Sequence, residues 1–138
     1  MFESQGKLHY SIVKYHKLIV EVDSEIVRYY RAMMPKYVQS QPQMHRPHIS
    51  VTRHERIPNL DFWGKYEGEL VKFYYDGIIH EDTVYYWLNC FCGRLEEIRV
   101  ELGLSVHSQY TEPPEGFKKV FHITISNKKS FPHEKMNK

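Results

Sequence analysis

Hydrophobic and polar residues alternate along several short stretches of this chain, and this period-two pattern predicts β-strands. Two β-hairpins are expected. One joins the strand 8–15 to 18–22, and the other joins 67–75 to 78–80 through an Asp-Gly turn. The predicted strands cover residues 8–15, 18–22, 48–53, 67–75, 78–80, 84–91 and 119–126.

Two stretches have a helical period instead. Asp23 or Ser24 is a typical N-cap for a helix that runs to about Met34. A second helix is predicted over 94–102, and Gly103 follows it as a C-cap. The resulting order of hairpin, helix, strand, hairpin, strand, helix and strand predicts an α+β fold with a mainly antiparallel sheet and helices packed outside it.

Two of the predicted strands carry nearly the same string. Pro47-His48-Ile49-Ser50-Val51 and Phe121-His122-Ile123-Thr124-Ile125 both read histidine, apolar, hydroxyl, apolar after their first residue. Because side chains alternate between the faces of a strand, each histidine shares a face with its hydroxyl residue, and the isoleucines point the other way. Each strand follows a helix and a loop, which predicts two similar lobes with a central cleft between them.

This arrangement of side chains suits acid–base chemistry at a phosphate. Imidazole titrates near neutral pH, so His48 and His122 are candidates for a general base and a general acid. The hydroxyls of Ser50 and Thr124 are candidates for binding phosphate oxygens. A third copy, His9-Tyr10-Ser11, has no helix before it, and we expect His9 to be a surface histidine on an edge strand.

Composition narrows the range of functions. The length of 138 residues predicts one domain over 1–126, followed by a polar tail over 127–138. No apolar run reaches the length of a membrane span and the N-terminus has no signal-like apolar segment, so we expect a cytoplasmic protein without a membrane partner. The net charge of +2 does not suggest binding to duplex nucleic acid. Cys90 and Cys92 are expected to be reduced core thiols.

The two histidine strings resemble the signature of the two-histidine (2H) phosphoesterase superfamily. More of the chain resembles a small family from tailed phages that includes the anti-CBASS nuclease. The stretches that carry this second resemblance are 10–15, 25–31, 47–51, 85–89 and 121–125.

The superfamily resemblance implies a bilobal α+β fold, and a metal-independent phosphodiesterase without a cofactor, with His48 and His122 as the catalytic pair and Ser50 and Thr124 on phosphate oxygens. The phage family implies a cyclic di- or trinucleotide substrate, cleaved at a 3′–5′ bond inside an infected bacterial host to evade CBASS immunity. It also implies that Tyr10 lies near the nucleotide, whereas alternation places Tyr10 on a core face; both interpretations stay open.

Other functions also remain open at this stage. Three alternatives are a 2′,3′-cyclic phosphodiesterase of RNA ends, a sponge that holds a cyclic nucleotide without cleaving it, and a phage accessory protein with structural histidines. A zinc site that uses His45, His48 and His54 is a further alternative. The sequence does not determine the preferred base or linkage, the oligomeric state, or which histidine is the acid.

Overall fold

The computed structural model describes residues 1–35, 40–42, 46–106 and 121–128 of the chain. Two α-helices lie within these residues, α1 (Ser24–Met33) and α2 (Gly93–Glu101), with a short 3-10 turn at Leu60–Phe62. The strands are β1 (Phe2–Ser11), β2 (Lys17–Glu21), β3 (Ser40–Pro42), β4 (His48–Thr52), β5 (Leu70–Tyr75), β6 (His80–Glu81), β7 (Tyr85–Phe91) and β8 (Phe121–Lys128).

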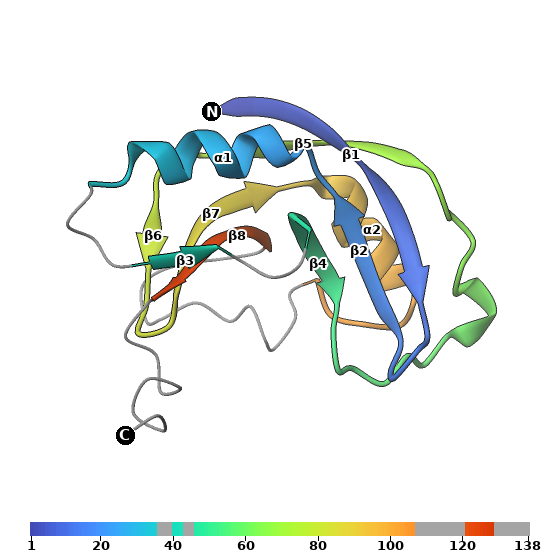
Figure 1. Ribbon diagram of the computed structural model, residues 1–138. Coiled ribbons are helices and arrows are strands. Elements are labelled where there is room, and N and C mark those ends of the chain that lie inside the picture. Colours follow the sequence, from blue (N-terminus) through green and yellow to red (C-terminus); the bar gives the residue numbers. More distant parts are fainter. Residues whose placement is uncertain (36–39, 43–45, 107–120, 129–138) are drawn as a thin grey trace, which may run out of the picture.

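The described strands form one sheet that closes on itself (Figure 1). Their order is β3-β8-β4-β2-β1-β5-β7-β6, and β8 also pairs with β7, so the strands from β8 round to β7 make a closed ring. Every pairing is antiparallel. The prediction of an α+β fold with a mainly antiparallel sheet is therefore confirmed. Neither described helix has the length and apolarity needed to cross a membrane.

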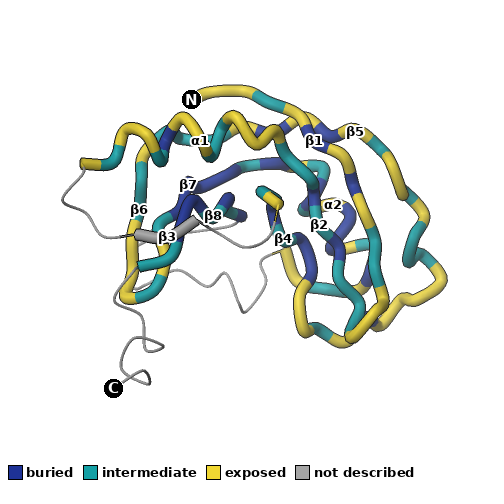
Figure 2. The backbone as a smooth tube through the Cα atoms, in the orientation of Figure 1, coloured by how far each residue is buried: buried dark blue, intermediate teal, exposed yellow. Residues whose placement is uncertain are grey.

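The core fills the inner face of this ring (Figure 2). Apolar residues from β1, β2, β4, β5, β7 and β8 are buried there. α2 adds Leu95 and Ile98 to the same cluster, and so does Leu102 at its C-cap. On α1, Tyr30 packs against Leu88 and Ile125. Both described helices thus pack on the core face of the sheet, and neither of them lies over the other face of β4 and β8.

Local signals place the helix ends as the sequence predicts. The carboxylate of Asp23 accepts a hydrogen bond of 2.9 Å from the backbone N–H of Glu25, which caps the start of α1. Gly103 follows α2 with φ of +89°, a backbone conformation that favours glycine.

Cys90 and Cys92 are free and buried as expected, and burial raises the pKa of both thiols.

The expected hairpin of residues 67–75 with 78–80 is wrong. β5 pairs instead with β1 and β7, while β6 pairs with β7. The tight turn lies between β6 and β7, where one carboxylate oxygen of Asp82 accepts hydrogen bonds of 2.7 Å from the backbone N–H groups of Val84 and Tyr85. β5 pairs with the long strand β1, which lies far from it in the chain, and not with the residues that follow the Asp-Gly pair.

Several strand boundaries also differ from the prediction. β1 begins at Phe2 and ends at Ser11, whereas residues 8–15 were expected. Between α1 and β4, where no strand was predicted, β3 pairs with β8. β8 continues to Lys128, whose backbone N–H donates to the carbonyl of Val84 at 2.8 Å, so the strand includes the first two residues of the segment 127–138. Residues 129–138 lie outside the described part of the chain.

A buried ion pair holds α2 against β4. The guanidinium of Arg99 is fully buried and donates to both carboxylate oxygens of Glu55 at 2.9 Å. It also donates to the backbone carbonyl of Val51 at 2.8 Å and to that of Ser105 at 2.7 Å. Loss of one partner leaves the other charge buried without compensation, and such a change is strongly destabilising.

We therefore expect Arg99→Ala to lower the free energy of unfolding by about 3–5 kcal/mol, measured by urea denaturation. Arg28→Ala is the control, because Arg28 and its partner Glu25 form an exposed pair on α1. The control should leave the stability nearly unchanged. Equal losses in the two variants would contradict the role given to the buried pair.

Candidate active site

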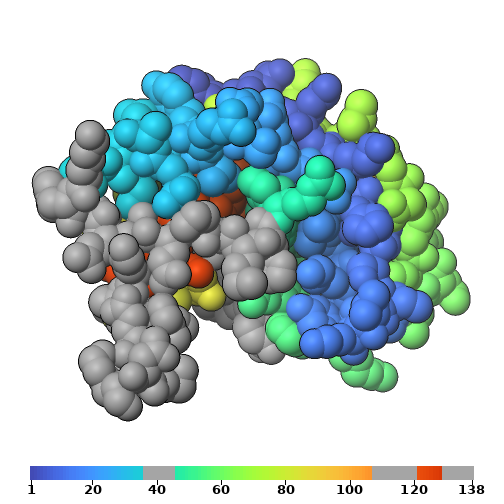
Figure 3. Space-filling model, viewed as in Figure 1, coloured from blue at the N-terminus to red at the C-terminus, as the bar shows by residue number. Residues whose placement is uncertain are grey.

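The two histidine strands are neighbours in the sheet. β4 pairs with β8 through Ile49 and Ile123, which lie opposite each other and are both fully buried. Their chain neighbours therefore point to the other face. Figure 3 shows atoms of β8 in orange-red close to the teal-green start of β4, on one face of the molecule. Folding thus brings His48, Ser50, His122 and Thr124 together, and each of them is partly exposed.

The register determines how these four residues are arranged. Continuing the antiparallel pairing by one residue from Ile49 and Ile123 sets His48 across from Thr124 and Ser50 across from His122. Residues directly across such a pair have Cβ atoms about 4.5–5.5 Å apart, and diagonal neighbours lie about 7–8 Å apart. The two histidines are therefore diagonal neighbours on one face of the strand pair.

Both strands are irregular at the same point. In β4 the register against β2 shifts so that Ser50 lies across from Ile19 and Thr52 from Leu18, which leaves Val51 as a bulge. In β8 the register against β7 shifts in the same way, across Ile125. The burial sequence from histidine to the fifth residue is identical in the two strands.

The repeated unit is therefore one residue longer than the four positions that the sequence pattern singles out. It reads His-Ile-Ser-Val-Thr in β4 and His-Ile-Thr-Ile-Ser in β8, and the final hydroxyl residue is fully buried in each. In β4 the hydroxyl oxygen of Thr52 takes the place of a backbone carbonyl in the strand pairing, because it accepts a hydrogen bond of 3.0 Å from the backbone N–H of Leu18. The bulge turns this fifth residue inward, so the two preceding polar side chains stay on the outer face.

A backbone hydrogen bond fixes the tautomer of His48. Its Nδ1 lies 2.7 Å from the carbonyl oxygen of Arg46. A carbonyl only accepts, so Nδ1 carries a proton in both the neutral and the charged ring. Neutral His48 is consequently unprotonated at Nε2, the nitrogen that gains or loses the titrating proton.

Residues of β7 form the surroundings of His122, and the sequence patterns did not single them out. Asn89 lies across from His122 and Trp87 across from Thr124. The indole ring of Trp87 meets the imidazole of His122 edge to face, with ring centroids 6.3 Å apart. Only the pairing of β7 with β8 reveals this contact, because the two segments lie more than thirty residues apart in the chain.

Hydrogen bonds hold the β7 side chains that surround His122. The indole N–H of Trp87 donates to Oδ1 of Asn89 at 2.9 Å, which orients the amide. Nε2 of His80 lies 2.8 Å from a carboxylate oxygen of Asp76 and donates to it. The amide nitrogen of Asn89 lies 3.1 Å from the same Nε2, and this is a packing contact because both nitrogens then carry protons. Trp87 and Asn89 are only 4% and 3% exposed, so the array is a rigid, largely dry support for His122.

A carboxylate flanks the other histidine. Glu21 of β2 lies directly across from His48, and it is partly exposed on the same face as the imidazole. The sequence holds a weak signal for this position, since Glu21 follows the apolar Val20 in an alternating strand. Nothing in that alternation indicates which strand lies next to it.

Tyr10 is not brought to this site. It packs with the core residues on the helix-covered side of the sheet, and its ring meets that of Trp63 edge to face at 4.9 Å. Burial raises the pKa of its phenol. The structure thus favours the core-face interpretation over a place beside the nucleotide.

The third motif copy also differs from its prediction in one respect. His9 is exposed, as expected for a surface histidine, and its Nδ1 lies 3.0 Å from a carboxylate oxygen of Glu67. The strand that carries it, however, is not an edge strand, because β1 lies between β2 and β5. The backbone N–H of Tyr10 donates to the same carboxylate and holds the pKa of Glu67 below its usual value.

No group of three or more His, Cys, Asp or Glu side chains within the described ranges is arranged to hold a metal ion, and His45 lies outside those ranges.

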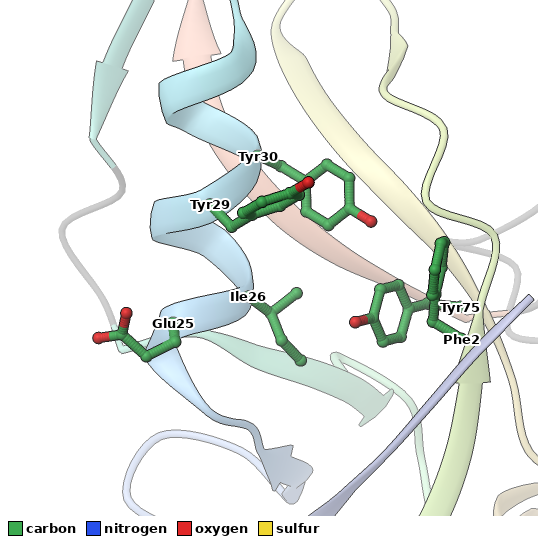
Figure 4. Close-up of a pocket in the computed structure, with 6 residues that line it drawn as sticks. All are labelled: Phe2, Glu25, Ile26, Tyr29, Tyr30 and Tyr75. Carbon is green, nitrogen blue, oxygen red and sulfur yellow. The ribbon is translucent and has the colours of Figure 1, made fainter.

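Away from the histidine pair, a pocket of about 350 Å³ lies between α1, β1 and β5 (Figure 4). Tyr29 and Tyr30 face Phe2 and Tyr75 across it, whereas the carboxylate of Glu25 points away.

No protein-family model, curated protein or solved structure matches this chain.

We expect nitrogen NMR of the imidazole rings to show neutral His48 as the Nδ1–H tautomer, because the carbonyl of Arg46 accepts from that nitrogen. His80 is the matched control. Its Nε2 faces the carboxylate of Asp76, so we expect the Nε2–H tautomer there. The Nε2–H tautomer at His48 would contradict the geometry described for this strand.

Proposed function

We propose that this chain is a metal-independent 2H phosphodiesterase that cleaves the 3′–5′ bonds of cyclic oligonucleotide second messengers. The observation that carries the proposal is the pairing of two strands with the same five-residue unit, which gathers two imidazoles and two hydroxyls on one face. The resemblance to the phage family suggests the biological role, which is evasion of bacterial CBASS immunity in the cytoplasm of an infected host.

The chemistry needs the groups that this face presents. Attack of a ribose 2′-hydroxyl on the adjacent phosphorus requires a base for the 2′-proton, an acid for the 5′-oxygen and donors for the phosphorane oxygens. Imidazole serves as base or acid near neutral pH. The hydroxyls of Ser50 and Thr124 suit the donor role, because each lies across the strand pair from the histidine of the other strand.

The bilobal arrangement of the superfamily is part of this proposal. The units in β4 and β8 have the same burial pattern and the same bulge, and each bulge lies against a different neighbouring strand. This equivalence supports two related halves that contribute one histidine each. In the proposed enzyme the central cleft runs between these halves, over the outer face of the two strands.

We expect the protein to convert ribose cyclic di- and trinucleotides in EDTA to linear products ending in a 2′,3′-cyclic phosphate, measured by product mass. A substrate with a 2′-deoxy or 2′-O-methyl group beside the scissile phosphate should resist cleavage, because the internal nucleophile is missing. Normal cleavage of that analogue would contradict internal attack. Return of every bound nucleotide intact would favour a sponge, and loss of activity in EDTA would favour a metal enzyme.

We expect His48→Ala and His122→Ala each to lower kcat by about 10²–10⁴-fold. Ser50→Ala and Thr124→Val should each lower it by about 10–10³-fold, because one donor to the phosphorane is lost. The unrelated motif copy in β1 supplies matched controls, His9→Ala and Ser11→Ala, which should keep nearly full activity in a steady-state assay. A control variant as inactive as its counterpart would overturn the choice of strands.

A further inference from the structure

The pocket between α1, β1 and β5 is lined mainly by aromatic rings (Figure 4). Phe2 and Tyr75 lie across from each other in the pairing of β1 with β5, and their ring centroids are 5.5 Å apart. Tyr29 and Tyr30 are consecutive residues of α1, and their rings meet edge to face at 5.0 Å. The four rings therefore form two aromatic walls, one on the helix and one on the strands.

The two walls meet at a buried end and open at an exposed one. The rings of Tyr30 and Tyr75 meet edge to face at 6.2 Å, and Tyr30 is only 6% exposed. Tyr29 and Phe2, by contrast, are 61% and 53% exposed. Small-molecule sites enclose about 300–1,000 Å³ and are lined by aromatic side chains with a few polar groups. The volume and lining of this pocket suit a flat ring that stacks on the two exposed aromatic side chains.

Two phenol hydroxyls inside the pocket have no hydrogen-bond partner among the described residues. Figure 4 shows the hydroxyl of Tyr30 pointing toward the strands and that of Tyr75 pointing back toward α1. Burial raises the pKa of both phenols, so each keeps its proton and can donate. Because a buried polar group without a partner is costly, these hydroxyls favour a ligand with a polar edge over a purely apolar one.

The charge of the lining narrows the ligand further. Among the described lining residues Glu25 alone is charged, and its carboxylate points away from the pocket. That carboxylate is engaged on the helix surface, where the guanidinium of Arg28 lies 2.7 Å from it. The described lining thus offers no cation to a phosphate group, whereas a neutral ring needs none.

From these features we infer that the pocket is a binding site for a neutral nitrogen heterocycle of the nucleobase class. The ring stacks on Tyr29 and Phe2, and its edge accepts hydrogen bonds from the hydroxyls of Tyr30 and Tyr75. Every nucleobase combines a π-face with acceptor atoms on its edge. The pocket shares no lining residue with the histidine face, and the inference does not rest on the proposed phosphodiesterase activity.

Two bicyclic probes of similar size test the polar edge. 9-Methyladenine carries acceptor nitrogens on its edge, and 1-methylindole carries none. In an NMR titration of the full chain, 9-methyladenine should shift the ring signals of Tyr29 and Phe2. 1-Methylindole should bind about 2–10-fold more weakly for each hydrogen bond lost. Equal affinities would overturn the inference, and so would shifts confined to the imidazoles of His48 and His122.

Variants of the lining test the two kinds of contact. Tyr29→Ala should weaken the binding of 9-methyladenine by about 5–150-fold, because a stacking surface is lost. Tyr75→Phe keeps the ring and removes one donor, so it should weaken binding by about 2–10-fold. Tyr74→Phe is the matched control, because Tyr74 is the exposed neighbour on β5 and takes the opposite face of the strand.

Unchanged affinity in Tyr29→Ala would overturn the stacking contact. A loss in Tyr74→Phe as large as that in Tyr75→Phe would overturn the hydrogen-bond contact. Thermal unfolding checks that each variant remains folded, and Tyr75→Phe should keep its Tm because the deleted hydroxyl has no described partner.

Competition against 9-methyladenine distinguishes two sources of the ring. Displacement by adenosine alone identifies a free nucleoside, whereas displacement by a cleavage-resistant 2′-deoxy cyclic dinucleotide of adenine identifies the base of an oligonucleotide. Displacement by neither would overturn the assignment to nucleobases. Because these experiments measure binding at the pocket rings, their failure leaves the proposed phosphodiesterase activity standing, and loss of that activity leaves this site standing.

Discussion

The pairing of β4 with β8 is the contact on which the candidate site depends. It joins the first half of the chain to the last described strand and completes the closed sheet. Ile49 and Ile123 make the pair, and both are removed from solvent into the shared core. Burial of these two apolar residues on one face forces the histidines and hydroxyls beside them onto the other, since strand side chains alternate. The composition of the site is thus a consequence of how the core is packed.

Matching bulges preserve this separation of faces. A strand that alternated without interruption would place the fifth residue of each unit, Thr52 or Ser126, on the outer face. Instead an extra residue in each strand turns that hydroxyl inward, and both positions are fully buried. Bulges of this kind redirect side chains and strengthen local twist. The two bulges lie against different neighbouring strands, β2 for β4 and β7 for β8.

The same sheet makes the two equivalent units differ in their surroundings. β2 brings Glu21 to one imidazole, whereas β7 brings Trp87 and Asn89 to the other. Cross-strand neighbours act over a few ångströms, where electrostatic and packing effects are strong. The two copies of the motif therefore have different cross-strand neighbours.

The sequence by itself determined the class of fold, the two helices and the two histidine strands, because these depend on local periodicity and on capping residues such as Asp23. It also identified four polar residues that share one face. Only the tertiary structure decided that β5 leaves its expected hairpin, that Tyr10 faces the core, and that Glu21 and Trp87 flank the histidines. Alternation shows which face a side chain takes, but the choice of strand partner depends on burial contributed by residues far away in the chain.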